Sequence, residues 1–166
     1  MSKTTQKNSA FTLVELLVVI AIIGVLSGVV IASLGLARQK ASNTAIKANL
    51  SSLRSSAEIV LANSGNTYGT QGFTLGTCPI VLDTTVFGTQ QIIDGIASAL
   101  RASGTGGTAT CVSTPSAPPV TTWAVSVKLK TPETINGVTS NYWCVDYLAN
   151  AKGEVSDLVG ADASCL

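Results

Sequence analysis

The sequence predicts an α+β fold in which a long N-terminal helical spine packs against a small antiparallel β-sheet of about three strands. Three patterns lead to this prediction. Residues 16–37 are apolar or neutral, a stripe of apolar residues at helical spacing follows them, and apolar and polar residues alternate closer to the C-terminus. The first pattern is typical of a helix in lipid, the second of a half-buried helix and the third of β-strands.

The charge-free run is long enough to cross a bilayer as a helix. Residues 16–37 at about 1.5 Å each give roughly 33 Å, and the hydrocarbon core of a bilayer is about 30 Å thick. Lys3 and Lys7 precede the run, so the positive-inside rule places the N-terminus in the cytoplasm. A secretory signal peptide is a rival interpretation, but its apolar core usually has only about 7–15 residues.

One carboxylate, Glu15, stands at the entrance to this apolar run. An ionisable residue in such a segment is costly unless it is paired, so we interpret Glu15 as functional. A plain single-pass anchor gives no reason for its presence.

A Lys-containing leader, the stretch Ala10-Phe11-Thr12-Leu13-Val14-Glu15 and the unbroken apolar run stand in one order. Together they resemble the class III signal of type IV pilins and of the related pseudopilins of type II secretion and competence systems. The resemblance implies that a prepilin peptidase cuts between Ala10 and Phe11 and methylates the new amine of Phe11. That charged amine would lie one helical turn from Glu15 and would need a carboxylate partner in an apolar surrounding. The resemblance further implies that Glu15 of one subunit meets the amine of a neighbour during assembly.

After the run, the helix is expected to continue with one buried face. Five apolar residues are spaced 4, 3, 4 and 3 apart: Ile46, Leu50, Leu53, Ala57 and Val60. The residues Asn63-Ser64-Gly65 then give a stop signal. Lys40, Lys47 and Arg54 recur every seven residues on another face. We interpret them as a solvated face, with contact to acidic groups of a neighbouring subunit as the alternative.

The remaining chain is expected to form a globular domain. A short helix is predicted at residues 89–104, with Thr89 as its cap and Gly104 as its stop. Residues 64–88 and 104–119 are predicted to be irregular, because the prolines of the second segment argue against a central strand. Strands are predicted at residues 122–130, 141–149 and 154–159, joined as an antiparallel meander.

We therefore expect four segments. Residues 1–10 are the cleaved leader, and residues 11–37 are the transmembrane and filament-core half of the helix. Residues 38–63 are its amphipathic half, and residues 64–166 are the extracytoplasmic pilin-like domain.

Four cysteines, none of them in a C-x-x-C arrangement, lie downstream of the apolar run. This placement predicts two disulfides in an oxidising compartment, with free buried thiols as the alternative. Of the three possible pairings we predict Cys78–Cys111 and Cys144–Cys165, because a bond from Cys165 to the middle strand would fix the C-terminal tail.

Composition argues against several kinds of chemistry. The net charge is +1 and the chain has no histidine, so it lacks both a strongly basic surface for nucleic acid and the commonest general base. We expect no enzyme activity, no cofactor and no metal site. The resemblance makes Glu154, Asp157 and Asp162 weak calcium candidates, although their spacing matches no calcium loop.

The leading hypothesis is a structural subunit of a type IV pilus-like filament. It would start as a single-pass precursor in the cytoplasmic (inner) membrane and end in an extracellular filament. Its expected partners are further copies of itself, the prepilin peptidase, the inner-membrane assembly platform and, before assembly, the membrane. One alternative is the major pseudopilin of a type II secretion or competence system. An alternative of another class is a membrane-anchored binding domain that does not polymerise.

Overall fold

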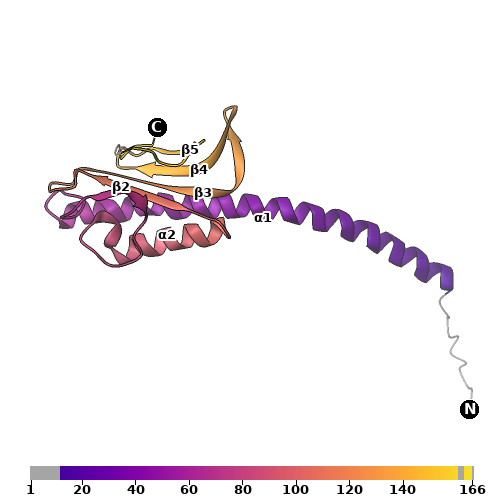
Figure 1. The fold of residues 1–166 in the computed structure, drawn as a ribbon. Helices are drawn as coiled ribbons and strands as arrows, with labels where there is room; N and C mark the ends of the chain where they lie inside the picture. The colour runs from indigo at the N-terminus through magenta and orange to yellow at the C-terminus, as the bar shows by residue number, and fades with distance from the viewer. Residues whose placement is uncertain (1–11, 161–162, 166) are drawn as a thin grey trace, which may run out of the picture. The chain divides into compact units, whose positions relative to one another are not determined.

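The computed structural model describes residues 12–160 and 163–165 and confirms the α+β fold (Figure 1). A long helix, α1 (Leu13–Asn63), is followed by one short helix, a 3-10 turn and a five-stranded antiparallel sheet. The elements after α1 are, in chain order, β1 (Phe73–Thr77), η1 (Val86–Gly88), α2 (Gln90–Ser103), β2 (Ala109–Thr114), β3 (Thr122–Ile135), β4 (Val138–Asp146) and β5 (Ala151–Glu154).

The chain divides by its internal contacts into two units, with the division between Arg38 and Gln39. The first unit contains the described residues 12–38, which are Thr12 and the first half of α1. The second contains the rest of α1, α2 and the sheet. The boundary after Ala37 between the transmembrane and amphipathic halves of the helix stays a prediction.

In the first unit the large apolar side chains are exposed. Leu13, Val25 and Ile31 are 78%, 71% and 70% exposed, and the neighbouring large apolar residues are exposed to a similar degree. Among the described residues, α1 is the one helix whose length and composition would allow it to cross a membrane.

In the second unit α1 ends where the sequence predicts, at a glycine. Gly65 has a left-handed φ of 69°, and the N–H of Asn66 donates to the carbonyl of Leu61 at 3.0 Å. This six-residue closure is the Schellman motif, which satisfies carbonyl groups that the helix leaves unpaired.

The helix α2 begins and ends within one residue of the predicted bounds. Gly104, with φ of 82°, is its C-cap, and Gly104 N donates to Leu100 O. The prediction that Thr89 caps the other end was only half right. Thr89 occupies the N-cap position, but its side chain makes no capping hydrogen bond and its buried hydroxyl has no partner in the described structure.

The sheet has the order β1-β2-β3-β4-β5, so each strand pairs with its neighbour in sequence (Figure 1). The sequence analysis predicted neither β1 nor β2, because both fall in segments expected to be irregular. The prediction that prolines exclude a strand from residues 104–119 was wrong, because β2 ends at Thr114, directly before Pro115. The strand expected at 154–159 was misplaced, since β5 occupies 151–154, most of the stretch predicted as a turn.

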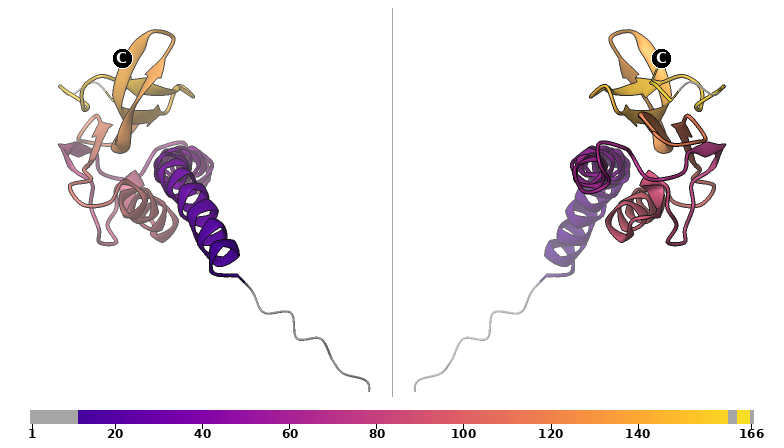
Figure 2. Two further views of the ribbon diagram at one scale, coloured as in Figure 1. Left: turned by 90° about the vertical axis from the view of Figure 1, so that its right-hand side faces the viewer. Right: turned by 90° about the vertical axis from the view of Figure 1, so that its left-hand side faces the viewer.

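The core of the second unit lies between the helices and one face of the sheet (Figure 2). The predicted stripe on α1 is confirmed, because Ile46, Leu50, Leu53 and Ala57 are at most 2% exposed and Val60 packs against them. The alternating residues of β3 meet this stripe. The buried residues of that strand face are Trp123, Val125, Val127 and Leu129.

The opposite face of the sheet is covered as well. Ala124 and Val112 pack with Ala163 and Leu158 in a second, smaller cluster. The C-terminal tail therefore covers part of the sheet face that the alternation of apolar and polar residues, taken alone, predicts to be exposed to solvent.

Candidate functional site

The N-terminal end of α1 is closed by a reciprocal capping box. The hydroxyl and the backbone N–H of Thr12 both donate to Glu15 Oε2, each at 2.8 Å. In return, Glu15 N donates to Thr12 Oγ1 at 3.3 Å. The carboxylate satisfies a backbone donor and lies at the end of the helix where the dipole favours negative charge. The sequence reasoning missed this pairing, although the spacing Thr-x-x-Glu is its known signature.

The predicted cleavage and methylation residues, Ala10 and Phe11, lie outside the described residues. Their neighbour Thr12 begins the described part, and its carbonyl accepts the first helical hydrogen bond from Leu16 N at 3.3 Å. Thr12 and Glu15 are thus fixed relative to the first turn of α1, at the head of an exposed apolar surface.

The structure joins the cysteines in the two pairs expected from the sequence. Cys78 is bonded to Cys111, linking the end of β1 to β2. Cys144 of β4 is bonded to Cys165, which attaches the C-terminal tail to the sheet.

A buried carboxylate, which the sequence reasoning did not single out, reinforces this tail. Asp146 is fully buried and accepts four hydrogen bonds. Its Oδ1 accepts from Leu148 N and Asn150 N, both at 3.0 Å. Its Oδ2 accepts from Asn150 Nδ2 at 2.8 Å and from Cys165 N at 2.9 Å. The motif Asp-x-x-x-Asn before a strand is a turn signal that could have indicated it.

The basic stripe on α1 contacts the sheet and is not a simple solvated face. Lys47 forms an ion pair with Glu133 of β3 and lies 4.5 Å from the ring centre of Trp143. Arg54 Nη2 donates to Ala149 O at 3.1 Å. Asn43 is fully buried and donates to the second carboxylate oxygen of Glu133 at 2.8 Å. The stripe therefore holds α1 against β3 and the β4–β5 turn.

Two side chains of the second unit have shifted pKa values. Burial by itself would raise the pKa of Glu133, but hydrogen bonds from Lys47 and Asn43, with the charges of Lys47 and Lys40, outweigh it and lower the pKa below 4.5. Burial raises the pKa of the Tyr68 hydroxyl to about 12, and its hydrogen bond to Glu58 adds to the rise. Both shifts follow from contacts that hold the fold together.

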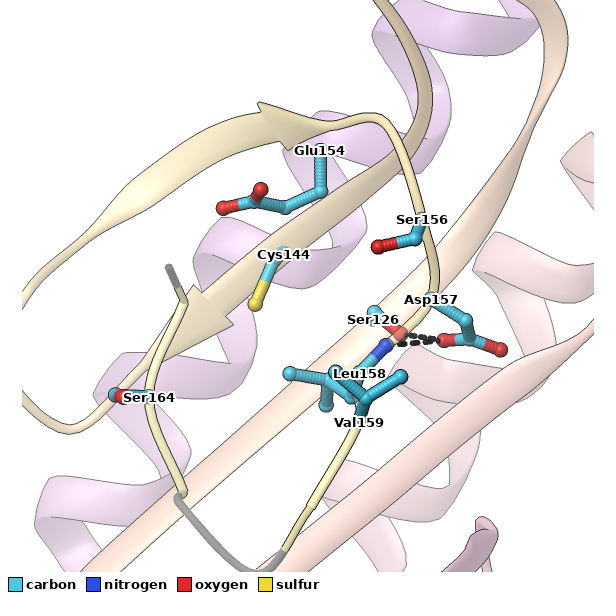
Figure 3. A pocket seen from close by; sticks show the side chains of 8 residues that line it. All are labelled: Ser126, Cys144, Glu154, Ser156, Asp157, Leu158, Val159 and Ser164. Carbon is cyan, nitrogen blue, oxygen red and sulfur yellow. Dashed lines mark hydrogen bonds between the residues drawn. The ribbon is translucent and has the colours of Figure 1, made fainter.

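Two of the calcium candidates, Glu154 and Asp157, line a small pocket beside the C-terminal tail (Figure 3). Asp157 accepts hydrogen bonds from Ser126, from Thr110 Oγ1 at 2.7 Å and from Leu158 N at 2.9 Å. Glu154 lies 3.4 Å from Lys152 Nζ, and Asp162 lies outside the described residues. Within residues 12–160 and 163–165, no three Asp, Glu, Cys or His side chains form a group that could hold a metal ion.

The tryptophans of β3 and β4 are part of the core or pack against it. Trp123 is 1% exposed and makes an edge-to-face contact with Tyr68, with ring centres 6.3 Å apart. Trp143 and Tyr147 are half-buried and pack against the same core.

Comparison with known proteins gives one match, at the N-terminus. Residues 5–31 match the family model of the prokaryotic N-terminal methylation motif. This motif is typical of type IV pilins and pseudopilins, and it includes Ala10, Phe11 and the Thr12–Glu15 capping box. No curated protein and no solved structure matches the chain.

Proposed function

We propose that this chain is the structural subunit of a type IV pilus-like filament. The methylation motif at residues 5–31 and the long apolar helix support a membrane-anchored precursor of the pilin and pseudopilin type. The finer steps are part of the proposal. A prepilin peptidase cuts between Ala10 and Phe11 and methylates Phe11, and an inner-membrane assembly platform then adds the subunit to the filament.

The observation that carries the proposal is the capped Glu15 at the head of an exposed apolar helix. A helix that is apolar on every side needs lipid or other helices around it. Lipid alone would not require a carboxylate at this depth, because a charge in an apolar surrounding costs several kcal/mol unless it is paired. In a bundle of such helices, the amine of Phe11 from one subunit and Glu15 of another satisfy each other and set the axial position of the incoming helix.

Glu15 has a capping role, which the structure describes, and a proposed role for its charge in assembly, and suitable substitutions can separate the two. Glu15→Val removes both the cap and the charge. Glu15→Gln keeps an oxygen that can accept from Thr12 N but removes the charge. Thr12→Ala removes the hydroxyl of the capping box and keeps the charge.

We expect Glu15→Val and Glu15→Gln to insert and to be cleaved but to give no filaments, in cells that lack the wild-type subunit. We expect Thr12→Ala to give filaments, because losing the cap hydroxyl costs only about 1 kcal/mol of helix stability. Electron microscopy of sheared filaments, with mass spectrometry of their subunit, measures the outcome. Normal filament yield from Glu15→Gln would refute the role of the charge. Wild-type chain found in the cell envelope, with none in sheared filaments, would favour the major pseudopilin instead.

A further inference from the structure

The second unit has two distinct ends, which are defined by the direction of α2. Near the start of α2, Thr89 and Gln91 line a hollow together with Ser56 and Ile59 of α1. At the other end of α2, Gly104 lies against the side chain of Lys130, whose backbone N–H donates to Asn43 of α1 at 2.8 Å. The helix α2 therefore runs antiparallel to this half of α1. We call the two ends the Asn43 end and the Tyr68 end.

Basic side chains gather at the Asn43 end. Lys128 and Lys130 are exposed and line a hollow of about 180 Å³ formed with Ser103 and the loop 105–107. Arg101, also exposed, lies in the last turn of α2, where it donates to Ser98 Oγ at 2.7 Å. We call these three residues the basic cluster. Three acidic groups also lie toward this end, and each is engaged. Glu133 pairs with Lys47, Asp157 accepts from Thr110 and Ser126, and Glu154 lies 3.4 Å from Lys152.

Acidic side chains gather at the Tyr68 end. Glu58 accepts a hydrogen bond from the hydroxyl of Tyr68 at 2.9 Å. Asp83 accepts from Thr85 N at 2.8 Å, and Thr85 pairs with Gly69, the residue after Tyr68. Asp94 is exposed in the first half of α2.

An apolar loop connects Cys78, which is hydrogen-bonded to Ala109 at the start of β2, to Asp83. Ile80, Val81 and Leu82 are 78%, 63% and 69% exposed. The loop is held on both sides, by the disulfide of Cys78 and by the turn at Asp83. Three consecutive exposed aliphatic side chains on a fixed loop mark an interaction surface.

The second unit is nearly neutral overall. Its two charged ends therefore result from where its charged residues lie, not from an excess of either sign. Without Lys3, Lys7, Arg38 and Glu15, the chain's ten basic and nine acidic side chains leave seven and eight in residues 39–166. The guanidinium of Arg54, which lies one turn before Glu58, is engaged by Ala149 O. The surface near α2 is thus basic at one end and acidic at the other.

We propose that these two ends are docking surfaces for further copies of this chain. The Tyr68 end of one subunit, with Asp83, Asp94 and the part of the loop 80–82 that adjoins Asp83, contacts the basic cluster of the next. The apolar loop excludes water from the ion pairs, which strengthens them. A contact between two identical ends would bring like charges together, and this repulsion selects the head-to-tail arrangement.

A head-to-tail contact between different surfaces leaves a free surface at each end of the assembly, so it continues into an open helical polymer. The inference rests on the proposed filament function and adds to it. The contacts between apolar helices would hold the subunits together. The two charged ends would determine which position each globular unit takes along the filament.

Charge reversal in the full-length chain, expressed without the wild-type subunit, tests this inference. One variant reverses the basic cluster through Lys128→Glu and Lys130→Glu. A second alters the acidic end through Asp83→Asn, which keeps the oxygen that Thr85 needs, and Asp94→Lys. We expect each variant to reduce the yield of sheared filaments by about tenfold or more, because like charges then meet at every contact. We expect the four-substitution chain to recover much of the wild-type yield, and co-expression of the two variants to do the same.

Two controls accompany these variants. Lys152→Gln removes a lysine at the β5 edge, where it pairs with Glu154, and should leave the yield unchanged, in contrast to Lys130→Gln. A non-reducing gel of membrane fractions shows whether each variant still forms oxidised, correctly inserted monomer.

Normal filament yield from both charge variants would overturn the inference. Loss of filaments without rescue in the four-substitution chain would overturn it too, and would point to a different anionic partner for the basic cluster, such as nucleic acid or anionic lipid. If the wild-type chain itself formed no filaments, the proposed function would fail, and that outcome is distinct from the other two.

Discussion

Removing the carboxylate of Asp146 should destabilise the second unit more than any exposed substitution. Asp146→Ala leaves four donors without their acceptor, one buried and three partly buried, namely three backbone N–H groups and the side-chain amide of Asn150. Each unsatisfied buried donor costs about 1–3 kcal/mol, and water entering the vacated space will compensate part of that loss. We expect a decrease of about 3–5 kcal/mol in the free energy of unfolding. Domains are stable by only about 5–15 kcal/mol, so this is a large share.

Asp146→Asn should show an intermediate effect. Its remaining oxygen can still accept from Leu148 N and Asn150 N, but its new amide group faces two donors, Asn150 Nδ2 and Cys165 N. We expect a loss of about 2–3 kcal/mol, because two hydrogen bonds are replaced by contacts between donors.

Guanidinium unfolding of the detergent-solubilised full chain, followed by tryptophan fluorescence, measures both variants. Trp123 and Trp143 lie in or against the core and report its opening. Thiol labelling gives a second readout, because loss of the bond to Cys165 N should raise the fraction of chains in which Cys165 remains reduced. The matched control is Asp94→Asn, an exposed carboxylate with one hydrogen bond to Gln90, for which we expect less than about 0.5 kcal/mol. A loss below about 1 kcal/mol for Asp146→Ala, with Cys165 fully oxidised, would refute this account.

Three further predictions follow from other contacts. Replacing Cys144 and Cys165 with Ser should lower unfolding stability by roughly 3 kcal/mol in the chain-entropy picture, and peptide mapping that joins Cys165 to another cysteine would contradict the pairing. Because the pKa of Glu133 is lowered in the folded state, its contribution is complete above about pH 4.5 and is lost as the pH falls through the folded pKa. Glu133→Gln should therefore flatten the acid side of the stability–pH curve, and an unchanged curve would exclude this carboxyl as its source. The mature chain should begin at methylated Phe11, so an intact mass that retains residues 1–10 would rule out the proposed cleavage.

The helices could be predicted because their signals are local. The stripe from Ile46 to Val60 repeats at the helical period, and Gly65 and Gly104 supply the left-handed conformation at which a helix ends. The capping box was missed although its signal is also local, because Glu15 was considered only as a charge and not as a partner of Thr12.

The sheet was harder to predict, because its limits depend on contacts that are distant in sequence. β1 and β2 are short and rich in Thr, and they become strands by pairing with each other and, for β2, with β3. The true position of β5 follows from Asp146, which organises the preceding turn and lets Ala151 pair with Val145. The partners of Lys47 and Asn43 lie about ninety residues away in β3, so no local pattern could reveal them.

The two outer strands of the sheet matter for how safely many copies can be crowded together. An open strand edge invites uncontrolled addition of another chain, which leads to amyloid-like aggregates. Here β1 has five residues with an irregular register between Phe73 and Gly76, and β5 has four residues and carries Lys152 and Glu154. Short, irregular or charged edges are poor templates for β-aggregation. A chain that reaches high local concentration can then associate through its other surfaces without its sheets fusing.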